Sequence, residues 1–300
     1  MAKLGWLAAL AAATVAAFGL VAQPASAASG KLSLEVDGIK RTAIIVEHSR
    51  LKRTRRPLVI VLHGSAGDSA RVRKNLGLDD IFGDNGAVLV FPDAYQGHWS
   101  LTDKPVADDG AFFRAMIAKL AGQGLVDSRR VYLVGVSGGG MLAMKLACTE
   151  PETYAGIATI IASLPTDLAA TCAPARPVPF LMISGTADGR VPWHGGATVN
   201  IDQVDTVASS DETLAVFAKA AGCGEPAKEQ AFTARSPKSK AFLDRFSNCQ
   251  VPVERVRIEG GGHTIPGRRG TEVPVTSGVQ NNDFESARLI YDFFKKLSGA

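Results

Sequence analysis

The feature that most constrains the fold of this chain is an apolar run at residues 131–136 that leads through Gly-Val-Ser-Gly-Gly into a helix-forming segment. A serine at a sharp turn between a strand and a helix is held in a strained conformation with its hydroxyl exposed. Gly135 and Gly139 suit such a turn, because side chains there would collide with the neighbouring strand or helix. The pattern predicts a nucleophile turn with Ser137 at its tip. The alternative is a glycine-rich loop that only begins a helix.

The order of apolar runs predicts the fold class. Two early runs favour a strand meander, and the later ones are short and continuous, as in strands that are covered on both faces. They alternate with helix-forming segments, which predicts an α/β fold with a mostly parallel central sheet covered by helices on both faces. The expected strands are residues 32–36, 42–47, 58–62, 88–91, 131–136, 157–162, 180–184 and 253–259, and the expected helices lie near 70–82, 108–122, 139–148, 211–221 and 283–297.

The first 27 residues resemble an export signal. Lys3 supplies a positive start, residues 4–21 are almost wholly apolar, and Ala25-Ser26-Ala27 offers small residues for cleavage. An uncleaved membrane anchor is the alternative. We expect residues 1–27 to be a signal peptide and residues 28–300 to form a single catalytic domain, secreted or periplasmic, with no stable membrane insertion after cleavage.

Charge and cysteine content narrow the partners further. The net charge of +4 is too small to indicate nucleic-acid binding, and the basic run at residues 50–56 is typical of a solvated loop. In an exported protein the cysteines predict two disulfides, and of the three possible pairings we favour the ones nearest in sequence, Cys148 with Cys172 and Cys223 with Cys249. Metal-ligand spacings are missing, so neither a metal nor another cofactor is expected. The oligomeric state stays open.

An activated serine needs a base and an acid that orients the base. When the serine lies on a strand-to-helix turn of such a sheet, the partners follow in the order serine, acid, histidine, which leaves His194 and His263 as candidates for the base. We favour His263, which lies on a glycine-rich loop just past the expected strand 253–259. Asp188 follows the expected strand 180–184 and is the predicted acid, although an Asp-Gly pair is also common in turns.

The oxyanion of the tetrahedral intermediate needs two N–H donors. Gly138, directly after the nucleophile, is expected to supply one of them. The other is expected from the loop after the strand at residues 58–62, and by position we favour the amide of Ser65.

Five motifs occur together and in order, and together they carry a family resemblance. The chain resembles secreted esterases related to poly(3-hydroxybutyrate) depolymerases, feruloyl esterases and acetylxylan esterases, over essentially all of residues 30–298. This resemblance implies an α/β-hydrolase fold and the activity of a serine carboxylic-ester hydrolase. The motifs are Leu62-His63-Gly64, Phe91-Pro92-Asp93, Gly135-Val136-Ser137-Gly138-Gly139-Gly140-Met141, Gly185-Thr186-Ala187-Asp188-x-x-Val191-Pro192 and Gly260-Gly261-Gly262-His263-Thr264-x-Pro266-Gly267.

The substrate is less constrained than the reaction. We expect a hydrolase of 3-hydroxybutyrate or other hydroxyalkanoate oligomers; a feruloyl or acetylxylan esterase is the alternative. More remote alternatives are a prolyl-oligopeptidase-type peptidase and a non-catalytic exported binding protein on the same fold. Trp99 and Trp193 follow expected strands and are predicted to line the substrate pocket. Ile265 stands where family members often carry tryptophan, so it is also a predicted pocket residue.

Overall fold

The computed structural model describes residues 28–47, 55–102, 105–201, 203–225, 229–267 and 277–297. The predicted signal segment, residues 1–27, lies outside these ranges, as does most of the basic run at 50–56. Within the ranges, no helix combines the length and the apolar character that a membrane span requires.

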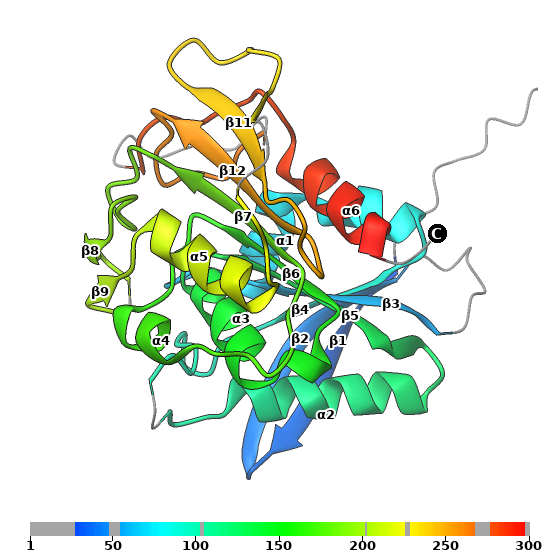
Figure 1. Ribbon diagram of the computed structural model, residues 1–300. Helices are drawn as coiled ribbons and strands as arrows, with labels where there is room; N and C mark the ends of the chain where they lie inside the picture. Colours follow the sequence, from blue (N-terminus) through cyan, green and yellow to red (C-terminus); the bar gives the residue numbers. More distant parts are fainter. Residues whose placement is uncertain are drawn as a thin grey trace, which may run out of the picture.

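A ten-stranded mixed sheet runs through the molecule in the order β1-β2-β4-β3-β5-β6-β7-β12-β11-β10 (Figure 1). The strands from β4 to β12 are parallel to their neighbours, and antiparallel strands extend the sheet at both ends. The parallel strands are apolar along almost their whole length because helices cover both faces. The strands are β1 (Ala28–Val36), β2 (Ile39–Glu47), β3 (Arg56–Leu62), β4 (Val88–Pro92), β5 (Val126–Val136), β6 (Gly156–Ile160), β7 (Phe180–Gly185), β10 (Gln230–Ala231), β11 (Lys240–Arg245) and β12 (Val253–Glu259).

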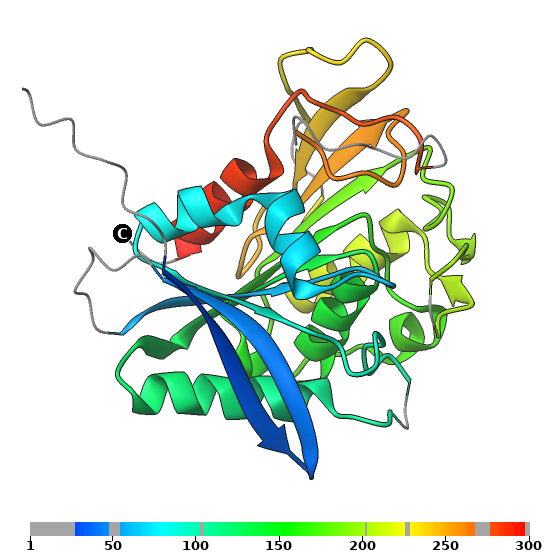
Figure 2. The same ribbon diagram turned by 180° about the vertical axis from the view of Figure 1, so that it is seen from behind.

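The helices lie in two layers, which Figures 1 and 2 show from opposite sides. One layer holds α2 (Asp109–Gly122), α3 (Gly138–Thr149), α4 (Thr166–Thr171) and α5 (Ser210–Ala220). The other holds α1 (Ser69–Leu76), the short π-helix Asp79–Gly83 and α6 (Ser286–Leu297). Each layer packs its apolar side chains on its own face of the sheet, so the molecule has two hydrophobic cores separated by the strands. The predicted α/β-hydrolase architecture is confirmed.

Local signals explain where the helices begin and end. Asp68 and Asp108 cap α1 and α2 by accepting hydrogen bonds from backbone amides of the first turn. Ser209 and Glu212 form a reciprocal capping box at the start of α5. The single helix predicted at 70–82 is instead divided, because Gly77 adopts a left-handed conformation (φ 59°) that ends α1.

The predicted strands are all present, whereas several short elements were missed. The most important of these is β11, which carries charged residues such as Asp244 and is bordered by polar sequence. Its burial depends on pairing with β12, a contact that a local pattern does not reveal. The other missed elements are α4, β10 and the small hairpin of β8 (Gly196–Ala197) and β9 (Thr206–Val207).

Two disulfides fasten the ends of helices, with the predicted pairing. Cys148 at the end of α3 bonds Cys172, which follows α4. Cys223, just after α5, bonds Cys249 in the loop between β11 and β12.

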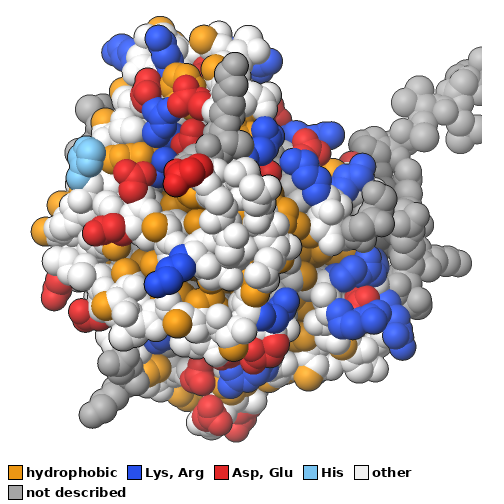
Figure 3. Space-filling view, viewed as in Figure 1, with side chains coloured by type: hydrophobic (Ala, Val, Ile, Leu, Met, Phe, Trp, Pro, Cys, Tyr) orange, Lys and Arg blue, Asp and Glu red, His pale blue; other side chains and the backbone are white. Residues whose placement is uncertain are grey.

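Figure 3 shows one face of the molecule, on which basic side chains gather along one edge with acidic side chains among them.

Candidate active site

Ser137 occupies the sharp turn between β5 and α3. Its backbone angles (φ 53°, ψ −121°) lie in a region that side-chain-bearing residues rarely adopt. The turn is this tight because β5 and α3 touch at glycines: a Cβ on Gly135 would lie 2.3 Å from the carbonyl oxygen of Gly139. The Ser137 amide donates to the carbonyl of Ile160 at the end of β6, which fixes the tip of the turn to the neighbouring strand.

The three residues predicted to form the triad lie in one chain of hydrogen bonds. His263 Nε2 is 3.1 Å from Ser137 Oγ, and His263 Nδ1 is 2.8 Å from Asp188 Oδ2. The side chains of His263 and Asp188 are 9% and 2% exposed, so bulk water competes little for these contacts. The geometry places a proton acceptor beside the serine hydroxyl and a carboxylate behind that acceptor.

Both oxygens of the Asp188 carboxylate have hydrogen-bond partners. Its Oδ1 accepts hydrogen bonds from the backbone amides of Arg190 and Val191, at 2.8 and 2.9 Å. Its other oxygen faces His263. Since each oxygen of the carboxylate has a donor, its orientation is set before any substrate arrives.

The acid loop and the histidine loop contact each other through their backbones. They follow β7 and β12, which are parallel neighbours in the sheet. The Ala187 amide donates to the carbonyl of Gly261 at 2.9 Å, and the Gly260 amide donates to Thr186 Oγ1 at the same distance. A Cβ on Gly185 would lie 2.3 Å from the Gly261 oxygen, so the glycines permit this close approach.

The two predicted oxyanion donors lie side by side. A Cβ built on Gly138 would be 3.3 Å from the backbone nitrogen of Ser65 and 2.7 Å from its Oγ. Gly138 is the first residue of α3, whose N-terminus contributes a partial positive charge. Within the ranges described above, neither the Gly138 nor the Ser65 amide donates a hydrogen bond to the protein. Both N–H groups therefore remain available to a ligand.

Trp99 is buried and braces the Ser65 loop; it is not among the residues that line the catalytic cavity. Its indole Nε1 donates to the carbonyl of His63 at 2.8 Å, and its ring lies 4.6 Å from the imidazole of His63. His63 Nδ1 contacts the carbonyl of Gly64 and Nε2 accepts from the Ala94 amide, so the ring is neutral with its proton on Nδ1. The prediction that Trp99 lines the pocket is wrong, because its large apolar ring is buried and its N–H donates to a carbonyl inside the protein.

Burial lowers the pKa of His63, even though its bond to Gly64 and the nearby Asp93 oppose that shift. In the unfolded chain a histidine has a pKa of about 6.5. Below that pH the unfolded chain binds more protons than the folded one until the lower, folded pKa is passed. We therefore expect the free energy of unfolding to fall as the pH drops from 6.5 into this interval.

Chemical denaturation of the wild type, His63→Gln and His194→Gln at pH 8, 6.5 and 5.5 measures this effect. The decline should be shallower in His63→Gln, which has no imidazole to protonate in that buried position. His194 is an exposed loop histidine, so its variant serves as the matched control and should keep the wild-type slope. Identical slopes for all three proteins would contradict the assignment.

A cavity of about 240 Å³ opens beside Ser137 and His263. Its apolar wall comes from segments far apart in the sequence, namely α1, the turn after β6, the 200 region and the histidine loop. Ile265 lies in this wall, as predicted. The other apolar lining residues, which sequence reasoning missed, are Ala66, Val72, Val136, Ile161 and Ile201.

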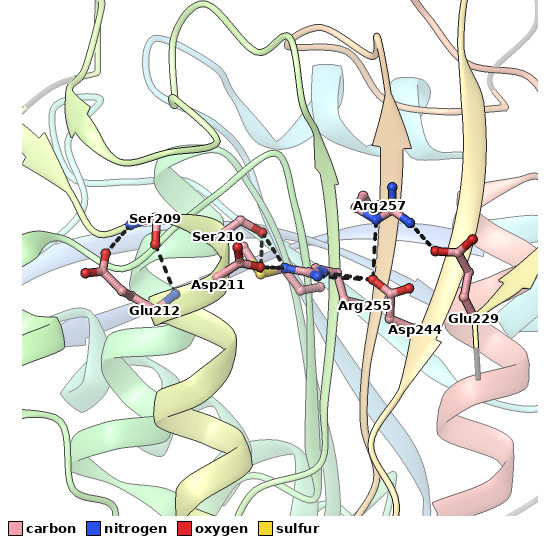
Figure 4. Close-up of polar contacts among 9 residues, drawn as sticks. Ser209, Ser210, Asp211, Glu212, Glu229, Asp244, Arg255 and Arg257 are labelled. Atoms are coloured by element: carbon pink, nitrogen blue, oxygen red, sulfur yellow. Dashed lines mark hydrogen bonds and ion pairs between the residues drawn. The ribbon is translucent and has the colours of Figure 1, made fainter. Parts of the chain in front are cut away.

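Trp193 is also buried and lies outside the cavity lining, contrary to the prediction. The guanidinium of Arg255 lies 4.8 Å from the centre of the Trp193 ring. The backbone carbonyl of Trp193 accepts a hydrogen bond from the Ser210 amide. Arg255 in turn joins Asp211 of α5 to Asp244 of β11, with contacts of 2.5 and 3.1 Å (Figure 4). Trp193 thus anchors the loop that follows Asp188.

The other candidates for the base and the acid do not line the cavity. His194 is exposed, and Asp211 binds Arg255. In the part of the chain that the structure describes, no cluster of three or more histidine, cysteine and carboxylate side chains could hold a metal ion.

Comparison with known proteins adds three similarities. The chain is 30% identical to a putative esterase, NocK of Nocardia uniformis, over 256 residues that span 79% of this chain and 74% of the relative. It is 28% identical over 221 residues to feruloyl esterase B of Piromyces equi, covering 69% of this chain but 39% of that longer protein. The fold matches that of an acetyl xylan esterase from Aspergillus awamori with a TM-score of 0.57 and 14% identity, over 79% and 94% of the two chains. No protein-family model matches the chain.

Proposed function

We propose, on the premise that this chain belongs to the α/β-hydrolase esterase family related to the feruloyl and acetylxylan esterases, that its substrates are feruloyl or acetyl esters of plant cell-wall polysaccharides. As a carboxylic-ester hydrolase it needs a nucleophile, a base and a site for the oxyanion. The observation that carries the proposal is the hydrogen-bonded series Ser137, His263 and Asp188 at the mouth of the cavity.

In the acylation step, Ser137 Oγ attacks the ester carbonyl while His263 Nε2 takes the hydroxyl proton. The Asp188 carboxylate stabilises the imidazolium that forms and keeps the proton of Nδ1 directed toward itself. The carbonyl oxygen becomes an oxyanion, which the Gly138 and Ser65 amides bind. When the tetrahedral intermediate collapses, His263 returns its proton to the departing alcohol oxygen, and an acyl-serine remains.

Deacylation repeats the same chemistry with water in place of serine. His263 takes a proton from the water as its oxygen attacks the acyl carbon, and the same amides hold the second oxyanion. Collapse of this intermediate releases the carboxylic acid and returns the proton to Ser137. His263 is therefore the base when Ser137 or water attacks, and the acid when each tetrahedral intermediate collapses.

The apolar lining of the cavity supports binding of the acyl group. Ile161, Ile201 and Ile265 form an apolar wall next to the serine, which suits an acetyl group or the ring of a hydroxycinnamate. The hydroxyalkanoate oligomers expected first from the sequence have less support, because the relatives reported above are esterases of feruloyl, acetyl or unspecified esters.

The site of action is part of the proposal. Two disulfides join cysteines that a reducing cytoplasm would keep as thiols. Together with the signal segment expected at residues 1–27, they support action outside the cytoplasm.

Substrate preference is tested with purified protein on methyl ferulate, an acetylated xylo-oligosaccharide and a 3-hydroxybutyrate trimer, using Ser137→Ala as the blank. We expect kcat/KM for one of the first two to exceed that for the trimer by at least ~10-fold, equivalent to about 1.4 kcal/mol of transition-state binding. A preference for the trimer would overturn the cell-wall assignment and favour the oligoester alternative.

A further inference from the structure

The charged side chains that line the catalytic cavity carry a net positive charge. They are Asp68, Arg71 and Arg190. Asp68 caps α1 and lies 3.9 Å from Arg71, so these two offset each other. Arg190 is left as the uncompensated charge beside the nucleophile.

The backbone of Arg190 is fixed on both sides. Its amide donates to Asp188 Oδ1 at 2.8 Å, and its carbonyl accepts from the Val199 amide at 3.0 Å. The residue therefore sits two positions beyond the triad acid, in a loop that the catalytic geometry itself holds in place. A side chain that starts from a rigid backbone loses less entropy when it binds a ligand.

The guanidinium of Arg190, by contrast, has no hydrogen bond or ion pair to any residue within the described ranges. The arginines nearby differ. Arg255 and Arg257 both bind Asp244, and each has a further carboxylate partner (Figure 4). Arg190 differs from these two in having no such partner, and it is one of the residues that line the cavity.

A half-buried guanidinium without a partner gains most from a carboxylate, which it can bind through two parallel hydrogen bonds. Such a pair is stronger in a cavity than in open water because the local dielectric constant is lower. The apolar wall of the same cavity is suited to the uncharged part of the ligand. The site thus combines an apolar surface with one anion-binding group.

We propose that Arg190 binds a carboxylate carried by the substrate, so that the preferred esters of this enzyme are anionic. The inference rests on the proposed esterase function and adds a substrate class to it. The shared chemistry is a carboxylate near the scissile ester. It has two natural sources: a uronic acid in an acetylated acidic glycan, or the free acid end of a hydroxyacid oligoester.

The first test uses two activated esters of equal length, mono(4-nitrophenyl) adipate and 4-nitrophenyl hexanoate, which differ in a terminal carboxylate. We expect the wild type to favour the adipate, and Arg190→Gln to lower the ratio of kcat/KM values by roughly 10-fold, mostly through KM, since the contact is made in the bound ester and in the transition state alike. The preference should weaken at 0.5 M salt. Arg190→Lys should retain part of it, because the charge remains but the planar fork is lost.

Arg288→Gln is the matched control. Arg288 is an exposed arginine of α6 that is paired with Asp292, and its loss should leave the ratio unchanged. An unchanged ratio in Arg190→Gln would overturn the proposal. So would an equal fall on both esters, which is what a purely structural role for Arg190 predicts.

A second pair of comparisons separates the two sources. One sets an acetylated xylo-oligosaccharide with a glucuronate branch against its neutral counterpart, and the other sets the 3-hydroxybutyrate trimer against its methyl ester. An Arg190-dependent preference within the first pair supports the glycan, and within the second pair the oligoester. Failure of the inference is distinct from failure of the esterase function on which it rests. If the inference fails, Ser137-dependent turnover remains but shows no Arg190-dependent charge preference. If the esterase function fails, no ester is turned over.

Discussion

Replacing Ser137 with alanine is expected to reduce kcat for ester hydrolysis by about 10⁴- to 10⁶-fold, the range found when the nucleophile of a catalytic triad is removed. Ser137 Oγ lies 3.1 Å from His263 Nε2 and is the atom placed to form the acyl intermediate. Without it, the remaining donors still bind the ester but no covalent step occurs. The rate left over reflects only the oxyanion site and the binding of substrate.

The measurement is the initial rate on methyl ferulate or a 4-nitrophenyl ester, paired with labelling by a fluorophosphonate probe. Ser184→Ala is the matched control, because Ser184 is a buried serine on β7 whose hydroxyl has no hydrogen-bond partner within the described residues. The control should retain its rate and its label, whereas Ser137→Ala should lose both. Turnover that survives in folded Ser137→Ala would remove the basis of the esterase mechanism.

Gly135→Ala is expected to destabilise the protein by roughly 3 kcal/mol or more, and to lower activity beyond what partial unfolding explains. The new Cβ would lie 2.3 Å from the Gly139 oxygen and 2.6 Å from the Gly140 Cα. Both are backbone atoms of α3, so the clash is not relieved by a side-chain rotation. The helix must move away from β5, and Ser137 lies between the two. A displacement of about 1 Å at a nucleophile can cost on the order of 10²-fold in rate.

Thermal and urea denaturation, together with kcat measured below the unfolding transition, test this prediction. Gly122→Ala is the control because Gly122 lies at the end of α2 with open space around its Cα. Alanine there should leave stability unchanged or raise it slightly, since glycine is the weaker helix former. If Gly135→Ala were as stable and active as Gly122→Ala, the close packing of β5 on α3 would not be what shapes the turn.

The loops around the site show how the fold supports the chemistry. Asp188 and His263 lie on loops that are joined by backbone hydrogen bonds, at a point where glycines allow close approach. The Asp188 loop is anchored further by Trp193, whose ring packs against the guanidinium of Arg255. On the other side, Trp99 fixes the His63 carbonyl and with it the loop that carries Ser65. Buried aromatic side chains therefore orient the two halves of the site without contacting the cavity.

Much of this arrangement could be predicted from the chain alone. The parallel strands are continuous apolar runs, and residues that follow such strands gather at one edge of the sheet. Ser137, Asp188 and His263 each follow one of these runs, and the glycines beside them leave the space that close backbone contacts require. Their proximity could be foreseen because the pattern within each segment marks where its strand ends, and the carboxyl ends of parallel strands lie at one edge of the sheet.

The lining of the cavity was decided only by the tertiary structure. Trp99 and Trp193 follow strands as the catalytic residues do, yet both are buried, because an indole has a large apolar surface. The N–H of Trp99 also has a partner inside the protein. Ile161 and Ile201 reach the cavity through loops whose paths depend on contacts with distant segments. The strand β11, too, is formed by pairing with β12 and not by its own pattern. Local sequence thus determined the sheet and the reacting residues, because their signals are periodic and short-range. Apart from Ile265, the fold decided which side chains line the cavity, and it decided that Arg190 lacks a partner, because both depend on which remote side chains come within reach.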